Sequence, residues 1–183
     1  MQNISDQELI QLCTEASTKE KGFRLLMQAY QEKLYWTIRR MVHIHEDADD
    51  ILQNTLIKAY RFIENFNQES SLHTWLYRIA TNESLTFLKR KQKSQILSSD
   101  EMSEKLGVEL KADPYFSGDD WVINLKKAIE LLPTKQKAVF NLRYYDEMSY
   151  KKISEVLDTS EGALKASYHH AAKKIEEYLR NND

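Results

Sequence analysis

The stretch that decides the fold runs from Ser149 to Lys174 and reads Ser-Tyr-Lys-Lys-Ile-Ser-Glu-Val-Leu-Asp-Thr-Ser-Glu-Gly-Ala-Leu-Lys-Ala-Ser-Tyr-His-His-Ala-Ala-Lys-Lys. Apolar residues recur at helical spacing on both sides of an Asp158-Thr159 break: Ile153, Val156 and Leu157 before it, and Leu164, Tyr168, Ala171 and Ile175 after it. Thr159 or Ser160 can cap the second helix. The pattern predicts a helix-turn-helix, whose second helix projects its exposed face into a DNA major groove. A helical hairpin within a bundle has the same periodicity, so the motif alone leaves both structures open.

The composition of the whole chain favours an all-α protein. Its 183 residues include only 4 Gly and 2 Pro, and Gly107, Pro114 and Gly118 lie together, which leaves long runs without a helix breaker. The single cysteine, Cys13, excludes an internal disulfide and a cysteine-rich zinc site, and its apolar setting favours a buried structural thiol. No apolar run reaches the ~20 residues needed to span a bilayer, and the polar N-terminus is unlike a secretory signal. We therefore expect a cytoplasmic protein without membrane insertion.

Charge divides the chain into three parts. Residues 1–95 carry a net charge of +1, residues 96–120 carry −5, and residues 121–183 carry +2. The acidic middle part is rich in Ser, Asp, Glu and Gly and has too little apolar surface to order itself, which predicts a flexible linker between two small helical domains. Neither domain is strongly basic, so we expect weak DNA binding by the chain alone.

Acidic residues open the helix expected after His43-Ile44-His45: Glu46, Asp47, Asp49 and Asp50. Acids in a first turn complement the helix dipole, which is the simplest interpretation of these four. His43 and His45 are two residues apart and do not share a helix face, so the sequence predicts no metal site there.

A polar loop from Asn65 to Ser71 leads into a helix with aromatic and basic side chains, which ends in Lys89-Arg90-Lys91-Gln92-Lys93. Rings beside cations can stack on unpaired bases while neutralising phosphates. Trp75 is more typical of a core residue, which makes Tyr77 and Arg78 the better candidates for contact. The terminal basic cluster suits phosphate contact, although cations also favour a helix C-terminus.

Three stretches, in this order, resemble the extracytoplasmic-function (ECF) sigma factors of the sigma-70 class. They are Asp47-Ala-Asp-Asp-Ile-Leu-Gln-Asn-Thr-Leu-Ile-Lys-Ala-Tyr, then Leu72-His-Thr-Trp-Leu-Tyr-Arg-Ile-Ala-Thr-Asn, then Leu132-Pro-Thr-Lys-Gln-Lys-Ala-Val-Phe-Asn-Leu-Arg-Tyr-Tyr-Asp-Glu-Met-Ser-Tyr-Lys-Lys-Ile-Ser. The resemblance implies that residues 1–95 are the region 2 domain and that residues 121–183 are the region 4 helix-turn-helix domain. It also implies that residues 96–120 form a linker that passes through polymerase between the two domains.

The resemblance also implies three binding surfaces. The surface for the clamp helices of the polymerase β′ subunit consists of Asp49, Asp50 and Gln53. The surface for the opened minus-ten strand, whose loop captures a flipped base, consists of Lys58, Arg61, Asn67, Gln68, Ser70, Ser71, Leu72, Tyr77, Arg78, Lys89 and Arg90. The surface for the duplex minus-thirty-five element consists of Glu161, Lys165, Ser167, His169 and His170 near the groove and Lys173 and Lys174 on the backbone.

The sequence departs from the family where DNA is read. Ser167 and His170 stand where the family frequently has arginine, and Asp158 replaces a frequent glycine in the turn. Because arginine is the usual bidentate reader of guanine, a promoter consensus does not transfer to this chain.

The resulting hypothesis is a non-enzymatic, two-domain sigma factor without cofactor or metal. The implied partners are the β′ and β subunits of core RNA polymerase, duplex and single-stranded promoter DNA, and an anti-sigma factor. The chain contains no phosphate-binding glycine loop, metal-ligand cluster or nucleophile elbow. One alternative is a stand-alone helix-turn-helix regulator that binds DNA as a dimer. Another is a helical adaptor that binds only protein, against which the basic cluster from Lys89 to Lys93 argues.

Overall fold

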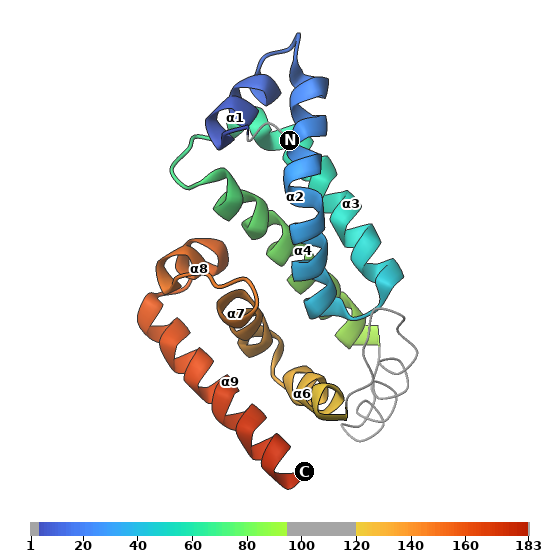
Figure 1. The fold of residues 1–183 in the computed structure, drawn as a ribbon, viewed down its shortest axis with the longest axis vertical. Coiled ribbons are helices and arrows are strands. Elements are labelled where there is room, and N and C mark those ends of the chain that lie inside the picture. Colours follow the sequence, from blue (N-terminus) through green and yellow to red (C-terminus); the bar gives the residue numbers. More distant parts are fainter. Residues whose placement is uncertain (1–3, 95–119, 183) are drawn as a thin grey trace.

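The computed structural model describes residues 4–94, here called the N-terminal half, and residues 120–182, the C-terminal half. Every regular element in these two ranges is helical (Figure 1), which confirms the predicted all-α class. The predicted linker of residues 96–120 lies outside the described residues except for Asp120, which begins a helix. The division into domains at these boundaries therefore stays a prediction.

The N-terminal half forms, in order, α1 (Asp6–Thr14), α2 (Lys19–Val42), α3 (His45–Phe62), the 3-10 turn η1 (Ile63–Asn65) and α4 (Leu72–Ser94). Ser5 begins α1 with a capping box: its hydroxyl accepts a hydrogen bond from the Glu8 amide, and the Glu8 carboxylate accepts one from the Ser5 amide. The long α2 continues without a break to Val42, as its apolar periodicity predicts. Its buried stripe faces α1, α3 and α4.

The C-terminal half forms α6 (Asp120–Glu130), α7 (Thr134–Tyr144), α8 (Tyr150–Leu157) and α9 (Glu161–Asn181). Between α8 and α9, Asp158 adopts the left-handed conformation with φ 49° and ψ 51°, which ends the first helix. Ser160 then caps α9 by accepting a hydrogen bond from the Ala163 amide at 3.4 Å. The predicted helix-turn-helix is thus α8, this turn and α9.

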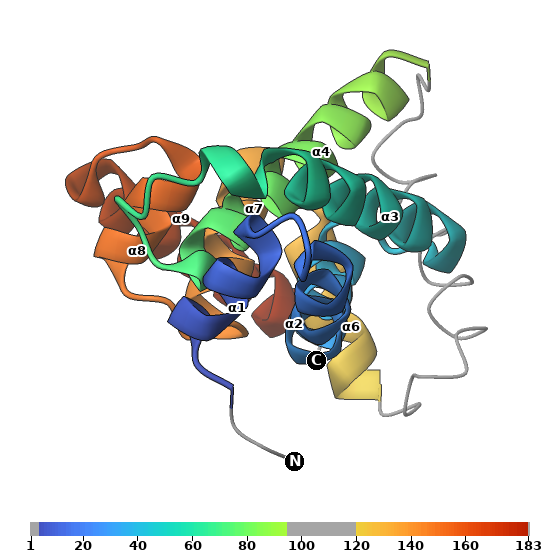
Figure 2. The ribbon, with the colours of Figure 1, turned by 90° about the horizontal axis from the view of Figure 1, so that it is seen from above.

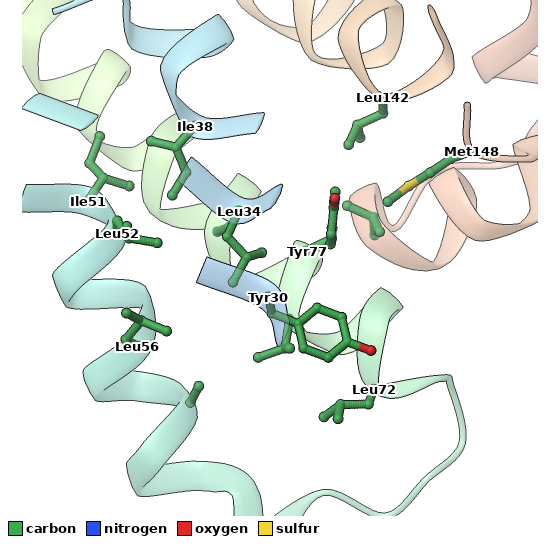
Figure 3. Close-up of a cluster of buried hydrophobic side chains, with 14 of the residues drawn as sticks. Tyr30, Leu34, Ile38, Ile51, Leu52, Leu56, Leu72, Tyr77, Leu142 and Met148 are labelled. Atoms are coloured by element: carbon green, nitrogen blue, oxygen red, sulfur yellow. The ribbon is translucent and has the colours of Figure 1, made fainter. Parts of the chain in front are cut away.

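One apolar core runs through both halves. Figure 3 shows Leu34 and Leu56 on the N-terminal side of this core, Leu142 and Met148 on the C-terminal side, and Tyr77 of α4 between them. Helix α8 packs on α4, and α7 contacts both α2 and α4. Burying an aliphatic side chain stabilises a fold by roughly 1.5–3 kcal/mol, so the apolar contacts across this interface hold the halves together.

A second, smaller core belongs to the C-terminal half alone. It joins α6, α7 and α9 and contains Ala128, Ile129, Leu132, Phe140, Ala171 and Ile175. Seen from above in Figure 2, α8 and α9 lie on the opposite side of the molecule from α3. The surface predicted to bind polymerase and the surface predicted to read duplex DNA therefore face different directions.

Candidate functional site

The outer face of α3 carries the residues predicted to bind polymerase. Its inner face is buried through Ile51, Thr55, Ala59 and their neighbours, which turns Asp50 and Gln53 outward into solvent. Asp49 is half-buried and faces His45, with 3.3 Å between Oδ2 and Nε2. The Nδ1 of His45 is in turn hydrogen-bonded to the hydroxyl of Tyr35 at 2.7 Å.

An exposed apolar residue follows these acids on the same helix. Ile57 is 48% exposed and lies one turn beyond Gln53. Tyr60 and Phe62 near the end of α3 are also exposed, at 37% and 52%. The sequence interpretation missed Ile57, although an aliphatic residue on an otherwise polar helix face is a readable signal of a docking surface.

The loop before α4 presents some of its predicted residues and buries another. Asn67 and Gln68 are exposed, and Gln68 has a left-handed backbone with φ 58°. Ser71 is exposed and begins α4, where its hydroxyl accepts a hydrogen bond from the Thr74 amide at 3.1 Å. Ser70 is half-buried, whereas Leu72 is 1% exposed and anchors the loop in the core. Leu72 is therefore placed to position this loop.

Two aromatic residues of α4, Trp75 and Tyr77, were considered in the sequence, and both pack against other parts of the protein. Trp75 packs against Phe66, with 5.1 Å between ring centroids, as favoured for a core residue. Arg78 is exposed, but Tyr77 is only 3% exposed and lies beside Thr37 of α2. Burial raises the pKa of Tyr77, and the charge of Asp146 raises it further. In this arrangement Arg78 can reach a nucleic acid and Tyr77 cannot.

The predicted cations of the N-terminal half lie on its surface. Lys58 and Arg61 are exposed on α3, and Lys58 forms an ion pair with Glu83 of α4. Lys89 and Arg90 are exposed near the end of α4. The neighbouring Lys91 instead contacts Asp47 at the start of α3, with 2.7 Å between Nζ and Oδ2, so it joins the two helices.

The outer face of α9 carries nearly all the residues predicted for duplex DNA. Leu164, Ala171 and Ile175 are buried, which leaves the opposite face to solvent. Exposed on it are Glu161, Lys165, His169, His170, Lys173 and Lys174, while Ser167 is half-buried. Lys174 contacts the amide oxygen of Gln136 at 3.2 Å, Lys165 lies over the ring of Tyr150 at 5.7 Å, and Lys173 pairs with Glu177 at 3.9 Å.

A cleft of about 520 Å³ lies between the two halves and was not predicted from sequence. Both halves line it, through Glu32, Lys33, Trp36, Arg40, His73, Tyr77, Tyr145 and Asp146. No sequence signal pairs residues that lie so far apart in the chain. Among the described residues, no group of His, Cys, Asp and Glu is arranged to hold a metal ion, and no helix there is long and apolar enough to cross a membrane.

Comparison with known proteins adds independent findings. Residues 26–94 match the family model for Sigma-70 region 2, and residues 123–175 match the model for Sigma-70, region 4. The ECF RNA polymerase sigma-E factor of Haemophilus influenzae is 30% identical over 187 residues, which cover 98% of this chain and 97% of the relative.

Two solved structures have a similar fold. The sigma factor RpoE from Bartonella quintana, in complex with the anti-sigma factor NepR, gives a TM-score of 0.67 at 20% identity over 87% of this chain and 98% of that chain. CnrH, in complex with the cytosolic domain of CnrY, gives a TM-score of 0.72 at 18% identity over 97% of this chain and 99% of that chain.

Proposed function

Because the chain belongs to the ECF group of the sigma-70 family of RNA polymerase sigma factors, we propose that it binds core polymerase through α3, holds opened promoter DNA along α4 and reads duplex DNA with α9. Sigma factors are non-enzymatic regulators, and the chain acts by positioning polymerase. The single observation that carries the proposal is that the two matched regions carry exposed polar faces on separate surfaces of the molecule.

The polymerase surface consists of Asp49, Asp50, Gln53 and Ile57. An exposed apolar side chain beside charged and polar groups is typical of a protein-binding surface, because the apolar group supplies binding energy and the charges set orientation. The β′ clamp helices are the partner of this surface.

The promoter surfaces act on two forms of DNA. Lys58, Arg61, Arg78, Lys89 and Arg90 neutralise phosphates of the opened minus-ten strand beside the Asn67–Ser71 loop, which captures an unpaired base. Extruding a base costs a few kcal/mol, so the loop that compensates this cost also selects the base. The exposed face of α9 reads the minus-thirty-five duplex, with Lys173 and Lys174 on its backbone.

An anti-sigma factor regulates the protein in the cytoplasm. Support comes from the similar fold of a sigma factor that was solved with its anti-sigma factor. Such a partner acts by competing for the polymerase surface or the promoter surfaces, and no motif in this chain identifies it.

Transcription with purified core polymerase on genomic promoter fragments tests the function. We expect start sites that depend on this protein, and we expect Asp49→Lys/Asp50→Lys to abolish them together with polymerase binding. The matched control Glu176→Lys/Glu177→Lys makes the same charge change on exposed positions near the end of α9 and should retain polymerase binding. Duplex binding by a dimer, with no response to polymerase, would instead establish the stand-alone regulator.

A further inference from the structure

The cleft between the two halves has the size of a small-molecule site. Its volume of about 520 Å³ lies within the roughly 300–1,000 Å³ that is usual for ligand pockets. Side chains from α2, α4 and the turn between α7 and α8 line it. Of the residues predicted for polymerase or promoter DNA, only Tyr77 is among them. The proposed function therefore leaves this cleft without a role.

Two polar atoms in the lining of the cleft are unpaired. The Oδ1 of Asp146 accepts hydrogen bonds from Arg40 Nη1 and Thr37 Oγ1, both at 3.0 Å. The Oδ2 of Asp146 and the Nδ1 of His73 are buried and have no hydrogen-bond partner in the part of the chain that the structure describes. The Asp146 side chain is 8% exposed. Because an unpaired buried polar atom costs free energy, a bound group that pairs with these atoms is stabilised.

Aromatic rings from three elements surround these polar atoms. Trp36 comes from α2, Tyr145 from the turn after α7, and the stacked pair His73 and Tyr77 from α4. One planar group already lies on these rings, since the Arg40 guanidinium is 4.7 Å from the ring centroid of Tyr145. A planar heterocycle binds aromatic side chains by the same kind of stacking. The walls of the cleft therefore favour a flat, aromatic ligand.

The rim of the cleft favours an anionic group. Lys33 of α2 lines the cleft and is exposed, and Lys152 of α8 is exposed nearby. Burial is the main cause of the lowered pKa of His73, and the charges of Lys152 and Lys33 lower it further. Both cations therefore act on the space around this imidazole. Glu32, also exposed in the lining, sets one negative charge against these two positive charges.

We propose that the cleft binds a purine mononucleotide with an exocyclic amino group, such as AMP or GMP. The base stacks on the aromatic walls, its amino group donates a hydrogen bond to Asp146 Oδ2, and its edge pairs with His73 Nδ1. The phosphate binds Lys33. Arg40, which holds Asp146, lies seven residues beyond Lys33 on α2, or about 10 Å along the helix, a span that a mononucleotide covers. The inference is independent of the proposed function.

Calorimetric titration of the full chain with AMP and GMP tests the site. We expect saturable one-to-one binding of at least one of them, together with a rise in the thermal unfolding midpoint. Adenosine lacks the phosphate and purine riboside monophosphate lacks the amino group, so each should bind several-fold more weakly than AMP. Absence of binding by both nucleotides, or binding of inorganic phosphate as tight as that of AMP, would overturn the proposal.

Matched variants locate the bound nucleotide. Lys33→Gln should weaken AMP several-fold and leave adenosine unchanged, whereas Lys21→Gln removes the same charge from an exposed position 12 residues earlier on α2 and should change neither. Asp146→Asn should reduce the preference for AMP over purine riboside monophosphate. Circular dichroism checks that each variant keeps its helices.

Equal AMP affinities of the two lysine variants would show that the phosphate does not bind at this rim and would overturn the assignment. The titrations contain no polymerase and no DNA. Failure of the proposed function appears separately, as absence of polymerase-dependent transcription by the wild type.

Discussion

His73 and Tyr77 stack on one face of α4, one helical turn apart, with 4.2 Å between ring centroids and 26° between ring planes. Both rings line the cleft between the halves. Burial lowers the pKa of His73, and Lys152 of α8 and Lys33 of α2 lower it further, against a smaller raising effect of Asp6. Burial and the two lysines therefore favour a neutral imidazole, which couples the protonation of His73 to the interface between the halves.

The fold should lose stability as the pH falls below 6.5, the ordinary pKa of this imidazole. Since the folded-state pKa lies below the unfolded value, the unfolded chain binds the proton first. The contribution of neutral His73 is fully present above pH 6.5 and is lost as the pH falls through the lowered pKa. His73→Phe keeps a ring in the stack without a titrating group. Urea unfolding at pH 7.5 and 5.5 should show a smaller pH dependence for this variant, and an equal dependence would contradict the prediction.

Gly22→Ala should destabilise the N-terminal half by about 1–3 kcal/mol, the usual cost of overpacking. A Cβ at Gly22 would lie 2.6 Å from the Leu12 carbonyl carbon and 2.7 Å from the Cys13 amide nitrogen. Because both obstacles are backbone atoms, relief requires α1 to move away from α2. The matched control is Gly162→Ala in the first turn of α9, where a Cβ meets nothing within 4 Å. The control should be neutral or stabilising by up to ~1 kcal/mol, and thermal unfolding distinguishes the two.

The sequence predicted local features of the fold better than its long-range contacts. Ser160, one of the two residues predicted to cap the second helix of the pair, is its cap, because a cap depends only on residues three positions away. The apolar stripe of α4 predicts that one face is buried, but periodicity does not say what covers it. Tyr77 was therefore predicted on the strand path, although the structure places it beneath α7 and α8.

The candidate site likewise contains residues whose positions the sequence predicted and a long-range contact that it did not. Exposed charges such as Asp50, Arg78 and Lys165 lie outward as helical spacing requires. The ion pair between Arg40 and Asp146 was not predictable, since the two residues are separated by 106 positions and each resembles an ordinary surface charge in the sequence.

Substitutions at Asp158, in the turn of the helix-turn-helix, should change the free energy of unfolding according to how readily each residue adopts a left-handed backbone. Asp158 has φ 49°, a conformation that glycine adopts readily and alanine resists. Asp158→Gly should raise the free energy of unfolding by about 0.5 kcal/mol, and Asp158→Ala should lower it by about 1 kcal/mol. Denaturant titrations of the two variants and the wild type test this order. Equal stability of the glycine and alanine variants would show that the left-handed turn is not retained in solution.

Glu83→Gln should strengthen binding of the opened promoter strand. Glu83 of α4 pairs with Lys58 of α3, whose side chain is 47% exposed and lies on the proposed strand path. Such an exposed pair contributes at most ~1 kcal/mol to stability, so its loss should leave the fold intact. The freed ammonium can then neutralise one more phosphate, which predicts a few-fold higher affinity and a salt slope steeper by about 0.7.

The matched control for this variant is Glu64→Gln, which releases Lys19 from an equivalent ion pair away from α4. Both variants remove one negative charge, so any general electrostatic gain is common to them. The measurement is an anisotropy titration of the polymerase complex with a single-stranded minus-ten oligonucleotide at several salt concentrations. It separates the local effect of freeing Lys58 from the general electrostatic gain. If Glu64→Gln matches Glu83→Gln in affinity and slope, Lys58 does not contact the strand, and the cations of the strand path are Arg61, Arg78, Lys89 and Arg90.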